Sequence, residues 1–100
     1  MIYIWLDDIR NAPYGYIHTH SVNETIALIE LLELKGYDSF TLDLDHDLGS
    51  FFNEGGDARN LIIWLISTER NTKLYKVNLH TANPVGYEYM KQMVNRYWEE

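Results

Sequence analysis

The alternation of short apolar segments with segments of helical periodicity constrains this chain more than any other feature. The apolar segments are rich in β-branched and aromatic residues and are bounded by polar or turn-forming residues, which predicts strands. They are residues 2–6, 16–20, 39–44 and 75–82. Strands separated by helices favour an α/β domain whose parallel sheet is covered by helices on both faces.

The predicted helices begin and end at recognisable capping residues. Ser21 and Glu24 form a capping box at the start of the first helix, and Gly36 closes it. The predicted helices are 22–35, a segment after the N-cap Asp57, and a segment after Asn83 that has Pro84 at its first position. The segments 9–15 and 49–56 contain turn-forming residues and predict loops.

Length and composition predict one globular domain. One hundred residues fit a single domain, 1–100, and a hydrophobic content of 46% suits a packed core. The absence of cysteine excludes disulfides and thiolate metal sites and favours a reducing cytoplasm. The longest apolar run, 61–66, is too short to cross a bilayer, and the first residues lack a basic leader. We therefore expect a cytoplasmic protein with no membrane partner.

The net charge restricts the ligands that this chain can bind. Fifteen acidic residues against eight basic ones give a formal charge of −7. A protein that coats duplex nucleic acid needs a basic face, so we expect no duplex partner. A phosphorylated ligand would need a metal ion or well-placed arginines to offset the local acidity.

Polar residues gather at the ends of three predicted strands. They are Asp7 and Asp8 after the first strand, Asp45, His46 and Asp47 after the third, and His80 and Thr81 at the end of the last. In open parallel sheets, ligands bind outside the carboxyl ends of the strands, near a topological switch point. We therefore expect these side chains to share one edge of the sheet.

The strand-end residues resemble those of response-regulator receiver domains. An acidic pair after strand one, an aspartate after strand three and Thr-Ala after a later strand follow the receiver order. The resemblance implies a small receiver-like (flavodoxin-like) three-layer α/β domain with a mostly parallel four-stranded sheet and about three helices. It also implies that Asp45 matches the phosphoacceptor, Asp7 and Asp8 the metal-binding pair, and Thr81 the hydroxyl-bearing switch residue.

The fuller motifs LDDIR, LDHDLG and HTANPVG are similar to those of cyclic-phosphate processing receiver domains, a divergent group. That group adds two histidines to the receiver edge, which match His46 and His80. The chain departs from ordinary receivers in two ways. It presents four strands, and no further strand follows that could present a lysine to a phosphoryl group. The helix after strand one is also reduced to the loop 9–15. Both departures weaken the case for phosphorelay.

The clustered aspartates predict a divalent metal site. Like charges at this density are unfavourable unless some groups are protonated or a cation lies among them. The candidate ligands are Asp7, Asp8, Asp45 and Asp47. All-carboxylate donors suit magnesium or manganese better than zinc. The alternative is that some of these residues are helix caps or solvated loop acids.

His46 and His80 are the candidate acid and base, with Asp45 as the third catalytic candidate. Imidazole titrates near neutral pH, so two histidines beside a phosphate can remove and deliver protons. Strand alternation raises one objection. If Asp45 points into the site, His46 points away from it unless the strand has already ended.

Arg10, Thr81 and Asn83 are the candidate substrate-binding residues. Arg10 can bind phosphate bidentately, or it can form a salt bridge to the neighbouring acids. Asn83 can cap the final helix, bind substrate, or do both. Taken together, the residues indicate phosphate and metal, and the resemblance adds a cyclic phosphate as substrate class.

We therefore expect a metal-assisted phosphoesterase whose partner is a small phosphorylated or cyclic nucleotide ligand. Two alternatives remain open. One is a non-catalytic degenerate receiver that binds a nucleotide or a protein, and the other is a phosphoacceptor receiver that uses Asp45. The sequence identifies no protein partner.

Overall fold

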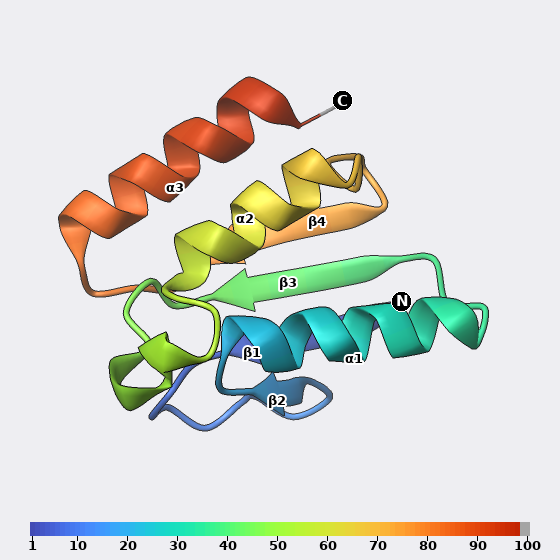
Figure 1. Ribbon diagram of the computed structural model, residues 1–100, viewed down its shortest axis with the longest axis horizontal. Coiled ribbons are helices and arrows are strands. Elements are labelled where there is room, and N and C mark those ends of the chain that lie inside the picture. The colour runs from blue at the N-terminus through green and yellow to red at the C-terminus, as the bar shows by residue number, and fades with distance from the viewer. Residues whose placement is uncertain (99–100) are drawn as a thin grey trace.

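A computed structural model describes residues 1–98 of the chain. Its centre is a sheet of four parallel strands in the order β2-β1-β3-β4 (Figure 1). The strands are β1 (Ile2–Leu6), β2 (Ile17–Thr19), β3 (Phe40–Leu44) and β4 (Tyr75–Leu79). The receiver-like α/β class and the parallel four-stranded sheet are therefore as expected. Three of the strands are shorter than predicted, since residues 16, 20, 39 and 80–82 lie outside them.

Three α-helices follow the strands at the predicted positions. They are α1 (Val22–Leu34), α2 (Ala58–Ser67) and α3 (Pro84–Tyr97). Each has its predicted N-cap: Ser21, Asp57 and Asn83 accept hydrogen bonds from backbone N–H groups of their own first turns. The segment 49–56 was predicted to be a loop, but its first part forms a short 3-10 helix, η1 (Gly49–Asn53).

The helices lie on one face of the sheet, which corrects the expectation that helices cover both faces in three layers. Figure 1 shows α1 and α2 in front of the strands, and α2 packs between α1 and α3. The reason is topological: the connections β2–α1–β3 and β3–α2–β4 move in the same direction across the sheet, and right-handed crossovers then fall on the same side. The connection that moves the other way, from β1 to β2, is a loop.

Side chains of the strands alternate between a buried face and an open one. The helix-facing side chains of β1 and β3 are fully buried except that of Ile2, which is partly buried, whereas Tyr3 on the other face of β1 is 42% exposed. The core comprises Ile4, Leu6, Val22, Ile29, Phe40, Leu42, Leu44, Leu48, Ala58, Leu61, Ile62, Leu65 and Met90. Part of the open face is covered by the β1–β2 loop, because the Trp5 indole donates a hydrogen bond to the Arg10 carbonyl at 3.1 Å.

The central strands β1 and β3 are neighbours, although their following segments leave toward opposite edges of the sheet. Their carboxyl ends therefore form the topological switch point where ligands bind in sheets of this kind. Among residues 1–98, no helix is long and apolar enough to cross a membrane.

Candidate active site

Three aspartates converge at the carboxyl ends of β1 and β3. Asp7 and Asp8 follow β1, and Asp45 follows β3, where its N–H still donates to the Leu6 carbonyl at 2.9 Å. One carboxylate oxygen from each residue lies within 4.8 Å of the others. Asp7 is fully buried and Asp45 is 7% exposed. The sequence-based expectation that these three side chains meet is thus confirmed by the geometry.

Asp7 is held as a carboxylate by its neighbours. Burial raises its pKa, but hydrogen bonds from the Ile9 and Arg10 N–H groups, from His80, and the charge of Arg10 outweigh burial and bring the pKa below its usual value. Both backbone groups donate to the Oδ1 atom at 2.8 Å. The Oδ2 atom is left to face His80 and the Arg10 guanidinium.

The pKa of Asp45 is shifted in the opposite direction. Burial raises its pKa, a hydrogen bond from the Thr81 side chain lowers it, and the charge of Asp7 raises it again. The net result is a pKa above the usual value. Ionisation of this carboxylate is therefore less favourable than in water, and a cation placed beside it would favour the charged form.

Arg10 bridges the two buried acids. Its Nε atom lies 3.3 Å from Asp7 and its Nη2 atom 3.8 Å from Asp45. The salt bridge considered from the sequence is therefore present. The side chain remains 52% exposed, so part of the guanidinium also faces solvent at the edge of the site.

His80 connects the acidic cluster to a further carboxylate. Its Nδ1 atom lies 2.6 Å from Asp43 and its Nε2 atom 3.0 Å from Asp7. Its ring stacks on Trp5 with centroids 3.6 Å apart and planes 5° apart. A neutral imidazole donates to one of these carboxylates, whereas the protonated ring donates to both. The ring is therefore fixed in position by contacts on two edges and one face.

Asp43 and Trp5 were missed by the sequence-based analysis. Both lie on strands two residues before a recognised aspartate, on the same strand face as that aspartate. This period-two spacing in the LDLD motif was the available signal.

His46 lies on the other side of the sheet edge, as alternation along β3 requires. Its Nδ1 atom is 2.9 Å from Asp47 and its Nε2 atom is 3.7 Å from Asp57, the N-cap of α2. Its ring lies against Gly86 of α3, where an added Cβ would be 2.4 Å from the ring Cγ atom. Within residues 1–98, His46 and His80 thus have separate partners, and neither ring contacts the other.

Asp47 and Asn83 form a second polar pair beside His46. The amide of Asn83 donates to Asp47 at 3.1 Å, while its Oδ1 atom caps α3. The hydrogen bond with His46 holds the pKa of Asp47 below its usual value. Asp47 was a candidate metal ligand, but the structure directs it to these partners and leaves it outside the group of three converging aspartates. Thr81 joins the two regions, since its hydroxyl accepts from the Asn83 N–H at 3.1 Å.

The converging aspartates fit a hard divalent cation. Three carboxylates offer oxygen ligands of the kind that magnesium and manganese prefer. The loop after β3 approaches them closely because Gly49 has no side chain. A Cβ there would lie 2.5 Å from the Asp8 carboxylate, and its φ of +56° is one that favours glycine.

A comparison with protein-family models places the chain in a family. The model described as the cyclic-phosphate processing receiver domain matches residues 2–96, which covers all strands and nearly all of α3. No curated protein and no solved structure shows significant similarity to the chain. The match agrees with the four-stranded parallel sheet and its three helices. The chain therefore belongs to the family of cyclic-phosphate processing receiver domains.

Proposed function

We propose that this domain is a metal-assisted phosphoesterase that opens a cyclic phosphate, either in a cyclic nucleotide or at a 2′,3′-cyclic phosphate end. The observation that carries the proposal is the hydrogen-bonded series Asp43–His80–Asp7 beside the acidic cluster. An imidazole fixed in this way next to candidate metal ligands suits proton transfer. The description of the family to which the chain belongs supports this substrate class.

Asp7, Asp8 and Asp45 are the proposed ligands of magnesium or manganese. When bound, such an ion supplies positive charge that offsets the negative charge of the phosphoryl oxygens. Arg10 adds a second positive charge at the same edge, and its exposed guanidinium can donate two hydrogen bonds to one phosphate. The Thr81 hydroxyl and the Asn83 amide are further proposed donors to substrate.

The proposed reaction needs one proton removed and one delivered. Water forms a new P–O bond as its proton passes to a base, and the ring P–O bond breaks as the departing alkoxide takes a proton from an acid. We assign the acid to His80, because Asp43 orients its ring toward the cluster. We assign the base to His46, whose Nδ1 atom is held by Asp47. The assignment of His80 has stronger support than that of His46, because His80 lies directly beside the acidic cluster.

The proposal is tested by assaying the protein with manganese or magnesium against 2′,3′- and 3′,5′-cyclic nucleotides and an oligonucleotide that ends in a 2′,3′-cyclic phosphate. We expect turnover with a bell-shaped pH dependence and a loss of at least ~100-fold in rate for His80→Ala or His46→Ala. The two losses should not add, because both residues serve one transition state. His20→Ala is the matched control, because His20 directly follows the edge strand β2 and its ring pairs with Glu24.

Two results would contradict this function. One is that the whole panel stays intact with either metal, and the other is that both alanine variants cleave as well as the parent. Binding of a cyclic nucleotide without turnover would instead place the non-catalytic binding module first.

A phosphoacceptor function at Asp45 is the second candidate, favoured by its position after β3 between the acidic pair and Thr81. The cation nearest its carboxylate is Arg10, at 3.8 Å, in place of the lysine that ordinary receivers use. We therefore expect that acetyl phosphate with magnesium leaves no stable aspartyl phosphate in the intact mass. Stoichiometric modification at Asp45 would move this candidate to first place.

A further inference from the structure

The outer edge of β4 carries unpaired backbone groups. In residues 1–98, β4 pairs with β3 on one side and with no strand on the other. The Phe40 N–H donates to the Leu74 carbonyl, and the His80 N–H donates to the Leu44 carbonyl. Even-numbered residues of β4 therefore bond to β3, and alternation turns the N–H and C=O groups of Val77 and Leu79 outward.

A groove runs along this edge between β4 and α3. Its volume is about 310 Å³, and its lining is Val77, Asn78, Leu79, Tyr87, Lys91, Val94 and Asn95. One end of the edge is already closed, because the Trp98 indole donates to the outward carbonyl of Tyr75 at 2.8 Å. Figure 1 shows α3 and β4 in the same part of the molecule, and the two elements are in contact. The part of the edge that remains accessible is thus a short segment of β4 with α3 beside it.

The charge of the groove differs from that of the protein. Its lining contains one cation, Lys91, two asparagines and no carboxylate, in a chain with a net charge of −7. The Lys91 ammonium lies 5.7 Å from the centroid of the Tyr87 ring. An acidic side chain would find its favourable partner here, unlike on most of this molecule's surface.

We propose that the outer edge of β4 binds an extended acidic peptide segment of a partner protein as an added strand. The outward groups of Val77 and Leu79 offer two donors and two acceptors to the peptide backbone, and Lys91 pairs with an acidic side chain of the peptide. A second copy of this chain fits less well. Pairing β4 with β4 would bring two Lys91 side chains, and two molecules of charge −7, toward each other.

The direct test is a titration of the ¹⁵N-labelled protein with a blocked six-residue peptide of alternating valine and glutamate. We expect the amide signals of Val77 and Leu79 to shift, with a Kd on the order of 0.1–1 mM because only four backbone hydrogen bonds are available. The same peptide with methylated amides along one edge should bind at least ~5-fold more weakly, because it cannot complete the strand pairing.

Two variants separate the backbone contribution from the charge. Val77→Pro removes an outward N–H and leaves the pairing of β4 with β3 intact, so it should weaken binding. Lys91→Glu should weaken binding at least ~5-fold, and a peptide with glutamine in place of glutamate should bind Lys91→Glu and the parent alike. Lys73→Glu, at an exposed position outside the groove, is the matched control and should bind as the parent does.

The proposal is overturned if the peptide shifts no β4 amide at millimolar concentration, or if the methylated peptide binds equally well. It is also overturned if sedimentation shows that the protein is a dimer and that Lys91→Glu changes this state, since a second copy would then be the occupant. None of these readouts involves phosphoesterase activity, so the result stands apart from the proposed function.

Discussion

At the scale of single residues, the site depends on which face of its strand each side chain occupies. Asp43 lies on the open face of β3, Asp45 follows the strand on the same side, and His46 lies on the helix side. Neighbours in sequence therefore contact different partners. His80 is fixed because Trp5 covers one face of its ring while two carboxylates occupy its two nitrogens. Rigid positioning of this kind is what a proton-transfer residue requires.

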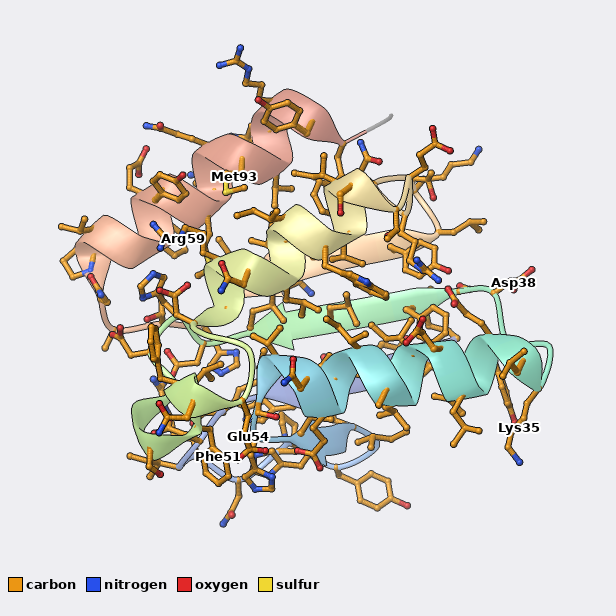
Figure 2. All side chains as sticks on the ribbon, in the orientation of Figure 1. Lys35, Asp38, Phe51, Glu54, Arg59 and Met93 are labelled. Atoms are coloured by element: carbon orange, nitrogen blue, oxygen red, sulfur yellow. The ribbon has the colours of Figure 1, made fainter. Side chains whose placement is uncertain are left out.

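The first prediction at this scale concerns Asp43→Asn. The amide keeps the shape of the side chain but removes the charge that orients the His80 ring, so activity should fall about 10–100-fold. The imidazole ¹⁵N shifts of His80 should also change, because a neutral amide replaces the carboxylate beside its Nδ1 atom. Asp38→Asn is the matched control, since Asp38 lies before β3 at the far end of the sheet (Figure 2). Equal activity in both variants would rule out a positioning role for Asp43.

The second residue-scale prediction concerns Gly86→Ala. The new Cβ would lie 2.4 Å from the His46 ring, so the ring must move. Overpacking costs about 1–3 kcal/mol and the gain in helix propensity returns up to about 1 kcal/mol, so the free energy of unfolding should fall by roughly 1 kcal/mol. Urea unfolding measures this change, and an NMR shift of the His46 ring reports the movement. Val85→Ala, which changes an exposed neighbour on α3, should leave the His46 signals in place.

At the scale of elements, a polar cluster at the opposite end of the sheet ties α1 to the segment before β4. Arg70 donates two hydrogen bonds to Glu33, at 2.9 and 2.7 Å, and its guanidinium lies 4.4 Å from the Trp64 ring centroid. The Tyr75 hydroxyl also donates to Glu33. Burial and then the hydrogen bond to Glu33 raise the pKa of Tyr75 to about 12. These hydrogen bonds connect α1 to the segment before β4 and to the start of β4, and they pair partly buried polar groups that would otherwise lack partners.

We expect Glu33→Gln to lower the free energy of unfolding by about 1–2 kcal/mol, because charge-assisted hydrogen bonds from a partly buried arginine are lost. Urea unfolding at pH 7 measures the loss. Glu30→Gln is the matched control, since Glu30 is an exposed position on the same helix.

The ion pair of Glu33 and Arg70 predicts that the free energy of unfolding depends on pH. The hydrogen bonds from Arg70 hold the pKa of Glu33 below its usual value despite burial. A lowered pKa means that the stabilisation is fully present above the unfolded value of about 4.3 and is lost as pH falls through the lower folded value. The stability difference between the parent and Glu33→Gln should therefore be constant above about pH 5 and shrink below it. A difference that is unchanged at acidic pH would contradict this assignment.

At the scale of the whole molecule, the distribution of charge links folding to the candidate metal site. The chain carries a net charge of −7, and three of its carboxylates meet at the switch point of the sheet. Two of them are buried, and the pKa of Asp45 lies above its usual value, chiefly because of burial. Folding therefore brings three carboxylates together at a position where the charge of Asp45 is disfavoured, and only the folded state offers this group to a cation.

We expect magnesium or manganese to raise the Tm of metal-stripped protein, because a ligand that binds only the folded state stabilises it. At a hundred times Kd the gain is about 2.7 kcal/mol, which corresponds to a rise of at least ~10 °C for a domain of this size. Asp8→Asn should reduce the rise, whereas Asp38→Asn should preserve it. Calorimetry with and without EDTA makes the measurement. A Tm that does not respond to millimolar metal would remove the metal site from the proposal.

The sequence by itself determined the local features of this protein. The N-caps at Ser21, Asp57 and Asn83 and the strand positions follow from residue types and periods within a few positions. The caps were therefore predicted at the observed residues, and the strand ends to within three residues. The positions of the acids at the ends of β1 and β3 could likewise be predicted from the neighbouring residues in the sequence. Their meeting could be anticipated because parallel strands align their carboxyl ends.

The tertiary structure decided what depends on contacts between distant segments. The His80 contacts to Asp43 and Asp7 span 37 and 73 residues, and no local pattern specifies them. The same holds for the single helix-covered face, which follows from the direction of successive crossovers, and for the open edge of β4, which follows from strand order. Side-chain period fixes which face a residue occupies, but only strand neighbours and crossover handedness determine what lies opposite that face.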